Sequence, residues 1–325
     1  RENELDCGQR FRNPIEETLA QAERIYRRAM ARTKDPLPIA VLRPTMVVGD
    51  SATGEVDRLD GPYLLILLML TAPPDLALPV PGRADVPLNV VPIDFVARAA
   101  IAIGRDPRAP GKTFHLVDPT PLPARRLVEL VARAGGRRAP SGFLPANIAR
   151  AILRAPGIER IPTRPRAFLE AMAVPVAYDH ANADELLQNT GIACPPLESY
   201  IDRLVTHVQR WLEARASYMK SLENTRTRTS HAQSAVVFGA LADLDARQGR
   251  LRDAYAHWRK ALTVIQEPET WGMLPLPLSG WVHIRIGEAL YEWNELGKAK
   301  DHLADGLKRA EVGGEMACFV IAEVD

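Results

Sequence analysis

The chain has 325 residues, enough for two domains of ordinary size, and its 41 basic and 40 acidic side chains leave a net charge of +1. That balance excludes the positive surface needed to bind nucleic acid or an anionic membrane, and the longest apolar run, 63–72, is too short to cross a bilayer. Cys7, Cys194 and Cys318 have no paired spacing, which excludes a disulfide framework or a C-x-x-C metal site and favours a cytoplasmic location.

A helix followed by a buried strand is the first pattern along the chain. Residues 14–33 repeat apolar side chains at spacings of three and four, and Pro14 is tolerated in a first helical turn. Prolines at 36 and 38 end this helix, because proline removes a backbone donor. The Val-, Ile- and Leu-rich residues 39–48 then predict a buried strand.

The same alternation continues to residue 136. Asp94 is predicted to cap the start of one of these helices, and Gly135-Gly136 to stop another. Strands that alternate with helices predict a parallel α/β sheet. The predicted segments are a buried helix at 61–72, a proline-rich loop at 73–85, a strand at 88–91, a helix at 94–104, a strand at 113–117 and a helix at 124–134.

A polar stretch divides the chain. Residues 138–175 have helical periodicity interrupted by prolines, and 197–212 form an amphipathic helix. Between 217 and 233 the residues become polar with little to bury, which predicts a linker over 214–234. We therefore expect an α/β domain at 1–213 and an all-α domain at 235–325.

The second domain contains an internal repeat. Ala254 and Ala299 are 45 residues apart, as are Ala261 and Gly306, and the neighbouring large apolar residues follow the same offset. Small residues beside large ones are what stacked helix pairs require. The sequence therefore predicts helical repeats, with the proline-rich residues 268–277 as a lengthened loop between them.

Four segments, in order, resemble one enzyme superfamily. They are FRNPIEETLAQAER, VLRPTMVVGDSATGE, VPIDFVARAA and GKTFHLVDPTPLPARRLVELV, and together they are similar to the second half of an extended short-chain dehydrogenase/reductase, an NAD(P)-dependent oxidoreductase or epimerase. The resemblance implies a partial Rossmann-like fold. It also implies that the Gly-rich cofactor turn would lie before Arg1, so that the chain, which lacks an initial Met, would be a piece of a longer protein.

The resemblance assigns roles to individual positions. The family's catalytic Tyr-x-x-x-Lys falls on Ile15 and Leu19, and neither side chain can move a proton or hold a charge. Pro44 and Thr45 lie where the family contacts its cofactor, NAD(P), and Met46 lies on the substrate side, although ordinary strand-end packing is the alternative for all three.

Two further positions, Arg83 and Asn89, lie where relatives recruit substrate contacts, and a solvated loop is the alternative for both. His115 lies in an apolar strand, which favours a core histidine over a catalytic base, and His283 occupies a packing position of the repeat. The seven histidines show no metal-ligand spacing.

The C-terminal region has a resemblance of its own. From residue 235 the chain is similar to tetratricopeptide-type repeats, and PLPLSGWVHIRIGEALYEWNELGKAKDHLADGLKRA resembles the helical sensor region of large ATP-dependent LuxR-type transcriptional regulators. Neither a P-loop nor a helix-turn-helix occurs in this sequence, so the resemblance implies a protein or small-molecule ligand and not nucleic acid.

Three interpretations follow from these features. The first is an NAD(P)-dependent enzyme, which the replacement of the Tyr/Lys pair makes inactive as it stands. The second is a binding or regulatory scaffold that acts through the helical repeats. The third is a fusion of two unrelated gene fragments. In each case a partial sheet exposes an unpaired edge, which predicts an oligomer that covers it and poor solubility of residues 1–213 alone.

Overall fold

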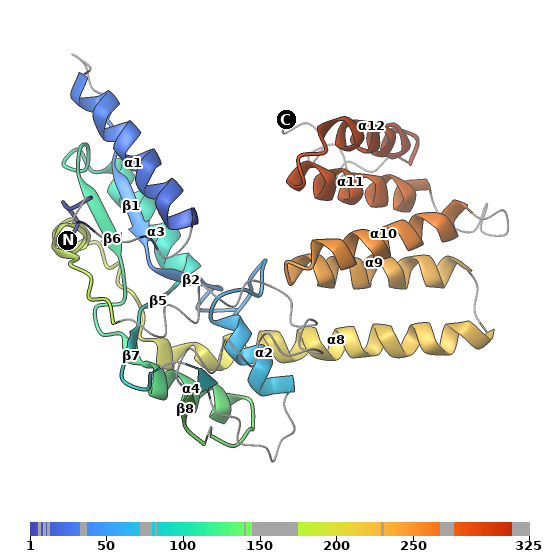
Figure 1. The fold of residues 1–325 in the computed structure, drawn as a ribbon, viewed down its shortest axis with the longest axis horizontal. Helices are drawn as coiled ribbons and strands as arrows, with labels where there is room; N and C mark the ends of the chain where they lie inside the picture. The colour runs from blue at the N-terminus through green and yellow to red at the C-terminus, as the bar shows by residue number, and fades with distance from the viewer. Residues whose placement is uncertain are drawn as a thin grey trace. The chain divides into compact units, whose positions relative to one another are not determined.

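The computed structural model describes residues 1–5, 8, 11, 14–32, 38–71, 80–81, 83–139, 141–144, 175–228, 231–266 and 276–313 (Figure 1). The chain divides into two compact units, Arg1–Gln209 and Arg210–Asp325. The first is mixed α/β with short, mostly parallel strand pairs, and the second is helical. Among the described helices, none combines the length and apolar character needed to span a membrane.

The N-terminal unit alternates strands and helices as expected. Its elements are α1 (Pro14–Arg32), β1 (Val41–Pro44), β2 (Met46–Val48), α2 (Tyr63–Thr71), β3 (Val80–Pro81), β4 (Pro87–Leu88), β5 (Val90–Pro92), α3 (Ile93–Arg105), β6 (Thr113–Leu116), β7 (Leu122–Pro123), α4 (Ala124–Ala134), β8 (Phe143–Leu144), α7 (Ala181–Leu187) and the 3₁₀ turn η1 (Leu197–Ser199). Helix α8 (Ile201–Arg228) begins in this unit.

The predicted strand 39–48 is divided at Thr45. Before it, β1 pairs in parallel with β6, with Val41 opposite Thr113, and after it, β2 pairs in parallel with β5, with Met46 opposite Val90. Successive residues of a strand direct their N–H groups to opposite sides. The Thr45 N–H accordingly donates to Leu116 and the next N–H donates to Asn89, so one strand exchanges partners at this residue.

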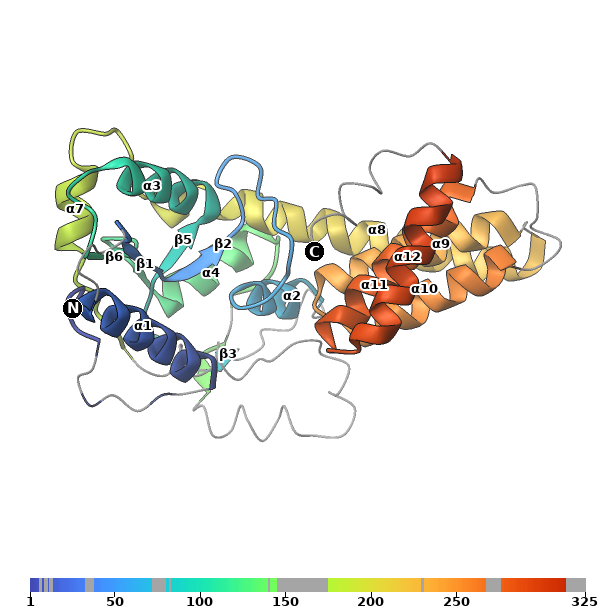
Figure 2. The ribbon, with the colours of Figure 1, turned by 90° about the horizontal axis from the view of Figure 1, so that it is seen from above.

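Side-chain alternation gives the β1–β6 pair a polar face and an apolar face. Leu42 and Phe114 belong to an apolar cluster that includes Phe95 and Ala99 of α3. On the other face Arg43 bonds Glu23 of α1, which lies alongside β1 (Figure 2). Helix α3 thus contributes hydrophobic burial to the sheet, whereas α1 is joined to it by hydrogen bonds and ion pairs.

The described part of the C-terminal unit contains two equivalent helix pairs. They are α9 (His231–Arg247) with α10 (Leu251–Gln266), and α11 (Leu276–Glu292) with α12 (Leu296–Gly313). The turns between them match at the 45-residue offset, since Gly249 and Asn294 both have positive φ, at 70° and 60°. Arg250 N–H donates to the Asp245 carbonyl at 2.9 Å, as Glu295 N–H donates to the Leu290 carbonyl at 2.9 Å. The repeat predicted from sequence is therefore present in the backbone.

Several predicted elements differ from the structure. Residues 214–228, expected in the linker, continue α8, because a polar composition does not by itself prevent a helix. Asp94 is not the cap of α3 but lies in its first turn, where its carboxylate accepts from the N–H and hydroxyl of Ser51, both at 2.9 Å. Helix α7 was not predicted. Residues 145–174 lie outside the described part of the chain.

Candidate functional site

The strand end predicted to face a cofactor is formed by the residues around Thr45. Pro44 is exposed, and Met46 is half-buried at the start of β2. The Thr45 hydroxyl donates to Oδ1 of Asn89 at 2.8 Å. The structure therefore brings Thr45 together with Asn89, two residues that the sequence placed separately in the cofactor and substrate groups.

Asn89 makes three hydrogen bonds within the fold. Its side chain is 7% exposed, its Nδ2 donates to the carbonyl of Asp118 at 2.8 Å, and its Oδ1 also accepts from the Asp118 N–H at 2.8 Å. A primary amide has two donors and two acceptor lone pairs. The three bonds use both lone pairs and one of the two Nδ2 hydrogens. Through them the amide joins the start of β5 to the end of β6 and to Thr45, where the strand exchanges partners.

The other predicted residues lie apart from this network. Arg83 is 57% exposed and forms a surface ion pair with Asp85 at 2.7 Å, and its hydrogen bonds hold the pKa of the Asp85 carboxyl below its usual value. Leu19 is 65% exposed on α1. Ile15 lies in the first turn of α1, and its side chain falls outside the described residues.

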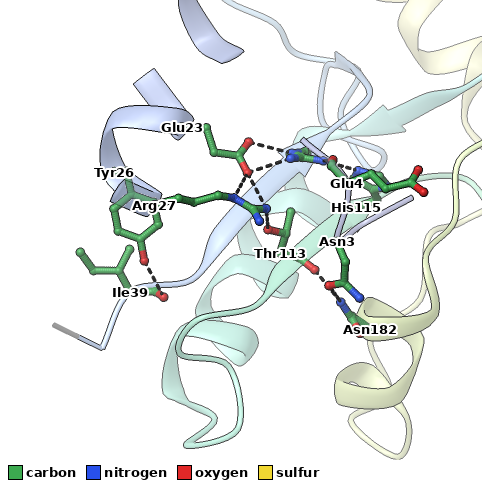
Figure 3. Close-up of polar contacts among 10 residues, drawn as sticks. Asn3, Glu4, Glu23, Tyr26, Arg27, Ile39, Thr113, His115 and Asn182 are labelled. Atoms are coloured by element: carbon green, nitrogen blue, oxygen red, sulfur yellow. Dashed lines mark hydrogen bonds and ion pairs between the residues drawn. The ribbon is translucent and has the colours of Figure 1, made fainter. Parts of the chain in front are cut away.

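A cluster of charged residues joins α1 to the polar face of β1 and β6 (Figure 3). Glu23 accepts from Nη2 of Arg43 at 2.7 Å and from Arg27 at 2.9 Å, while Arg27 also donates to the hydroxyl of Thr113 at 2.7 Å. Burial by itself would raise the pKa of Glu23, but the hydrogen bonds from both arginines lower it overall. The carboxylate is thus held in its ionised form.

His115 is a core histidine held by two bonds. Nη1 of Arg43 lies 3.2 Å from its Nε2, and because arginine only donates, Nε2 is the acceptor. Its Nδ1 then donates to the carbonyl of Asp179 at 2.7 Å. Burial, assisted by the charge of Arg43, lowers the pKa of His115. The imidazole is neutral with both nitrogens in use, which confirms the core interpretation.

The outer edge of β6 is covered by side chains that the sequence did not reveal. Glu2 is 1% exposed and accepts from the His115 N–H at 2.8 Å and from the Asn182 N–H at 2.6 Å, while Nδ2 of Asn182 donates to the carbonyl of Thr113 at 2.9 Å. These donors and acceptors point away from β1. Because Glu2 and Asn182 are 180 residues apart, no local sequence pattern signals their pairing.

An open cleft of about 650 Å³ lies beside β6, α3 and α7. None of the residues predicted to bind cofactor or substrate lines it. The polar groups that line it include His180 and Asp184, which form a hydrogen bond of 2.8 Å with each other. Its lining also includes Cys194, and burial raises the pKa of this thiol to about 12. The thiol is therefore protonated at neutral pH, which removes its nucleophilic form.

The polar groups of Thr45 and Asn89, two residues that the resemblance assigns to cofactor and substrate, are engaged with each other. Leu19, on the position that the resemblance assigns to the family lysine, is an exposed alkyl side chain. Among the described residues, no group of three or more potential ligands is placed to hold a metal ion.

The C-terminal unit contains a fully buried carboxylate, Asp245. It is 0% exposed and pairs with three basic side chains, namely Arg250 in close contact, His257 with Nδ1 at 2.9 Å and Arg215 at 3.6 Å. These partners come from α8, from the turn after α9 and from α10. The cluster joins three elements and leaves no carboxylate oxygen directed to solvent.

Comparison with known proteins agrees with the N-terminal resemblance. An NAD-binding family model, described as male sterility protein, matches residues 1–100, and none of the curated proteins matches the chain. A solved structure, the terminal R domain from the myxalamid PKS-NRPS biosynthetic pathway, is 22% identical with a TM-score of 0.46, over 59% of this chain. The chain spans 48% of the length of that structure.

Proposed function

We propose that the N-terminal unit is a reductase-type α/β unit that does not transfer protons, joined to a helical unit that binds a protein or small-molecule ligand in the cytoplasm. The match of residues 1–100 to an NAD-binding family supports the first part. The observation that carries the loss of catalysis is Leu19, an exposed alkyl side chain where an extended short-chain dehydrogenase/reductase has its lysine.

The loss of activity follows from the chemistry of that family. In an NAD(P)-dependent reductase the cofactor supplies a hydride, and a protein group must supply the accompanying proton. An isoleucine at 15 has no ionisable group, and leucine at 19 has no charge with which to lower a neighbouring pKa. Thr45 does not substitute for them, because its hydroxyl donates to Asn89.

A titration of the full chain with NADH and NADPH tests this proposal. We expect no saturable change in nucleotide fluorescence up to millimolar concentrations, and no oxidation of NADPH in the presence of a carbonyl compound. Saturable binding by the unmodified chain would revive the interpretation as an NAD(P)-binding enzyme, and turnover would overturn the proposal.

The two helix pairs support the binding role of the second unit. Residues 235–325 resemble tetratricopeptide-type repeats and the sensor region of LuxR-type regulators, and equivalent pairs of helices are arranged in series in the structure. Tyr255 of α10 and Trp293 of the turn after α11 have ring centroids 5.2 Å apart, so aromatic side chains join these two segments. Near-zero net charge argues against nucleic acid or an anionic membrane as the ligand.

Tryptophan fluorescence provides the test. All five tryptophans lie between Trp211 and Trp293, so quenching or a spectral shift reports on the C-terminal unit alone. A ligand of this unit should change the emission with saturation, and the variant Trp293→Leu should weaken that response. If substitutions in the N-terminal unit abolish ligand binding and Trp293→Leu does not weaken it, the assignment is contradicted.

The open side of β1 supports self-association. Among the described strands, β1 pairs with β6 alone, so its backbone groups on the opposite side are available to a further strand. We propose that a second copy of the chain covers this side. Light scattering of the full chain at micromolar concentration should then give a mass above that of one chain, and a monodisperse monomer would refute it.

A further inference from the structure

Two histidines pack against each other between α11 and α12, where His283 is buried and His302 is half-buried. His283 of α11 is 4% exposed, and its ring centroid lies 5.0 Å from that of His302 of α12 with an angle of 36° between the ring planes. Both ring nitrogens of His283 and Nδ1 of His302 have no hydrogen-bond partner among the described residues. The pair is therefore packed as an aromatic contact and not held as a polar network.

The surroundings oppose a positive charge on this pair. Burial is the largest cause that lowers the pKa of His283 to about 4, and Arg309 and His302 of α12 add to it. Asp305 acts in the opposite direction, but its carboxylate is 60% exposed and 3.9 Å away, too far for a hydrogen bond. Around His302, burial again lowers the pKa, with Arg259 of α10 adding to it and Asp305 and Asp301 opposing it.

The first helix pair has an acidic side chain beside the equivalent positions. At the 45-residue offset, His283 corresponds to Phe238 and His302 corresponds to His257. The rings of Phe238 and His257 are stacked with centroids 6.2 Å apart, and Nδ1 of His257 lies 2.9 Å from the carboxylate of Asp245. The position equivalent to Asp245 is Leu290, which is buried and apolar. The second pair thus has two histidines and lacks the acid.

We propose that the His283–His302 contact is an acid-sensitive switch, which holds α11 against α12 while both rings are neutral and releases this helix pair when they are protonated. The proposal rests on the buried contact, the orphaned nitrogens and the replacement of the acid by Leu290. It does not depend on the function proposed above. The device would make the C-terminal surface respond to acidification, whatever ligand that surface binds.

The direction of the pH dependence follows from proton linkage. A histidine with a depressed folded-state pKa binds its proton more strongly in the open state, so the closed state loses stability as protons become available. The stabilisation is complete above the ordinary histidine pKa of about 6.5 and declines as the pH falls toward the folded value of about 4. With these two values, the opening equilibrium rises about 20-fold between pH 7 and pH 5.

Hydrogen exchange of the full chain at pH 7 and pH 5, corrected for intrinsic amide rates, tests the switch. We expect the protection of α11 and α12 to fall by about 20-fold and that of α9 and α10 to change much less. The two helix pairs are internal references for each other, so this comparison needs no variant. Equal changes in both pairs, or no change in either, would overturn the proposal.

The variant His283→Phe gives the second readout, because it copies the residue found at Phe238. It should keep α11 and α12 protected at pH 5, with a change below ~3-fold, since the buried ring no longer titrates. If this variant does not fold, His283→Leu provides the same test, because leucine does not titrate either. The control His180→Gln lies in the N-terminal unit and should leave the response as in the unmodified chain. A 20-fold loss that persists in a folded His283→Phe chain would refute the assignment.

Discussion

The variant Asp245→Asn should destabilise the C-terminal unit strongly. The substitution keeps the shape of the side chain but removes the charge that Arg250, Arg215 and His257 face. Asp245 is 0% exposed and Arg250 is 17% exposed, so water cannot replace the lost anion. Removing one partner of a buried ion pair costs about 3–5 kcal/mol. We expect the lower end, about 3 kcal/mol, because the amide oxygen still accepts one hydrogen bond.

Urea denaturation followed by tryptophan fluorescence measures this cost, since every tryptophan lies in the C-terminal unit. With a slope of about 1.5 kcal/mol/M for a unit of this size, the midpoint should fall by about 2 M. Asp253→Asn is the matched control, because that carboxylate is 61% exposed and 4.0 Å from the same Arg250. Its midpoint should shift by less than ~0.3 M. If both variants shift equally, the buried network is not what joins these helices.

Three further variants test other parts of the structure. Asn89→Leu leaves the backbone N–H and carbonyl of Asp118 without partners, and should cost about 2–3 kcal/mol, seen as faster hydrogen exchange in β5 and β6. Gly287→Val adds atoms where a Cβ would lie 2.7 Å from Leu303, and should lower the urea midpoint of the C-terminal unit by about 1 M. Arg83→Ala removes only an exposed ion pair and should leave the hydrogen-exchange rates of β5 and β6 unchanged in the same assay.

The sequence pointed to candidate residues but not to what they contact. The family resemblance placed Thr45 at a strand end beside the cofactor and Asn89 among the substrate contacts. Their hydrogen bond to each other, and the bonds from Asn89 to Asp118, depend on how β5 and β6 approach the same strand. A polar residue engaged in the fold and one directed toward a ligand have the same sequence signature.

Long-range contacts account for what the sequence missed. Glu2 reaches His115 and Asn182 across more than a hundred residues, and helix α7 is positioned by that contact as well as by its own seven residues. A short helix has little stability of its own, so its formation depends on tertiary packing. The continuation of α8 through the polar residues 214–228 likewise was not evident from composition.

The sequence by itself determined the α/β alternation, the helical second half and the 45-residue repeat, because periodicity and spacing are local properties of the chain. It also determined that Ile15 and Leu19 have no proton to exchange. Only the tertiary structure decided that Asp245 is buried with its bases and that His283 is packed against His302 with no acid within hydrogen-bond distance. Burial removes the water that would otherwise solvate a charge, and whether a given side chain loses that water depends on residues far from it in sequence.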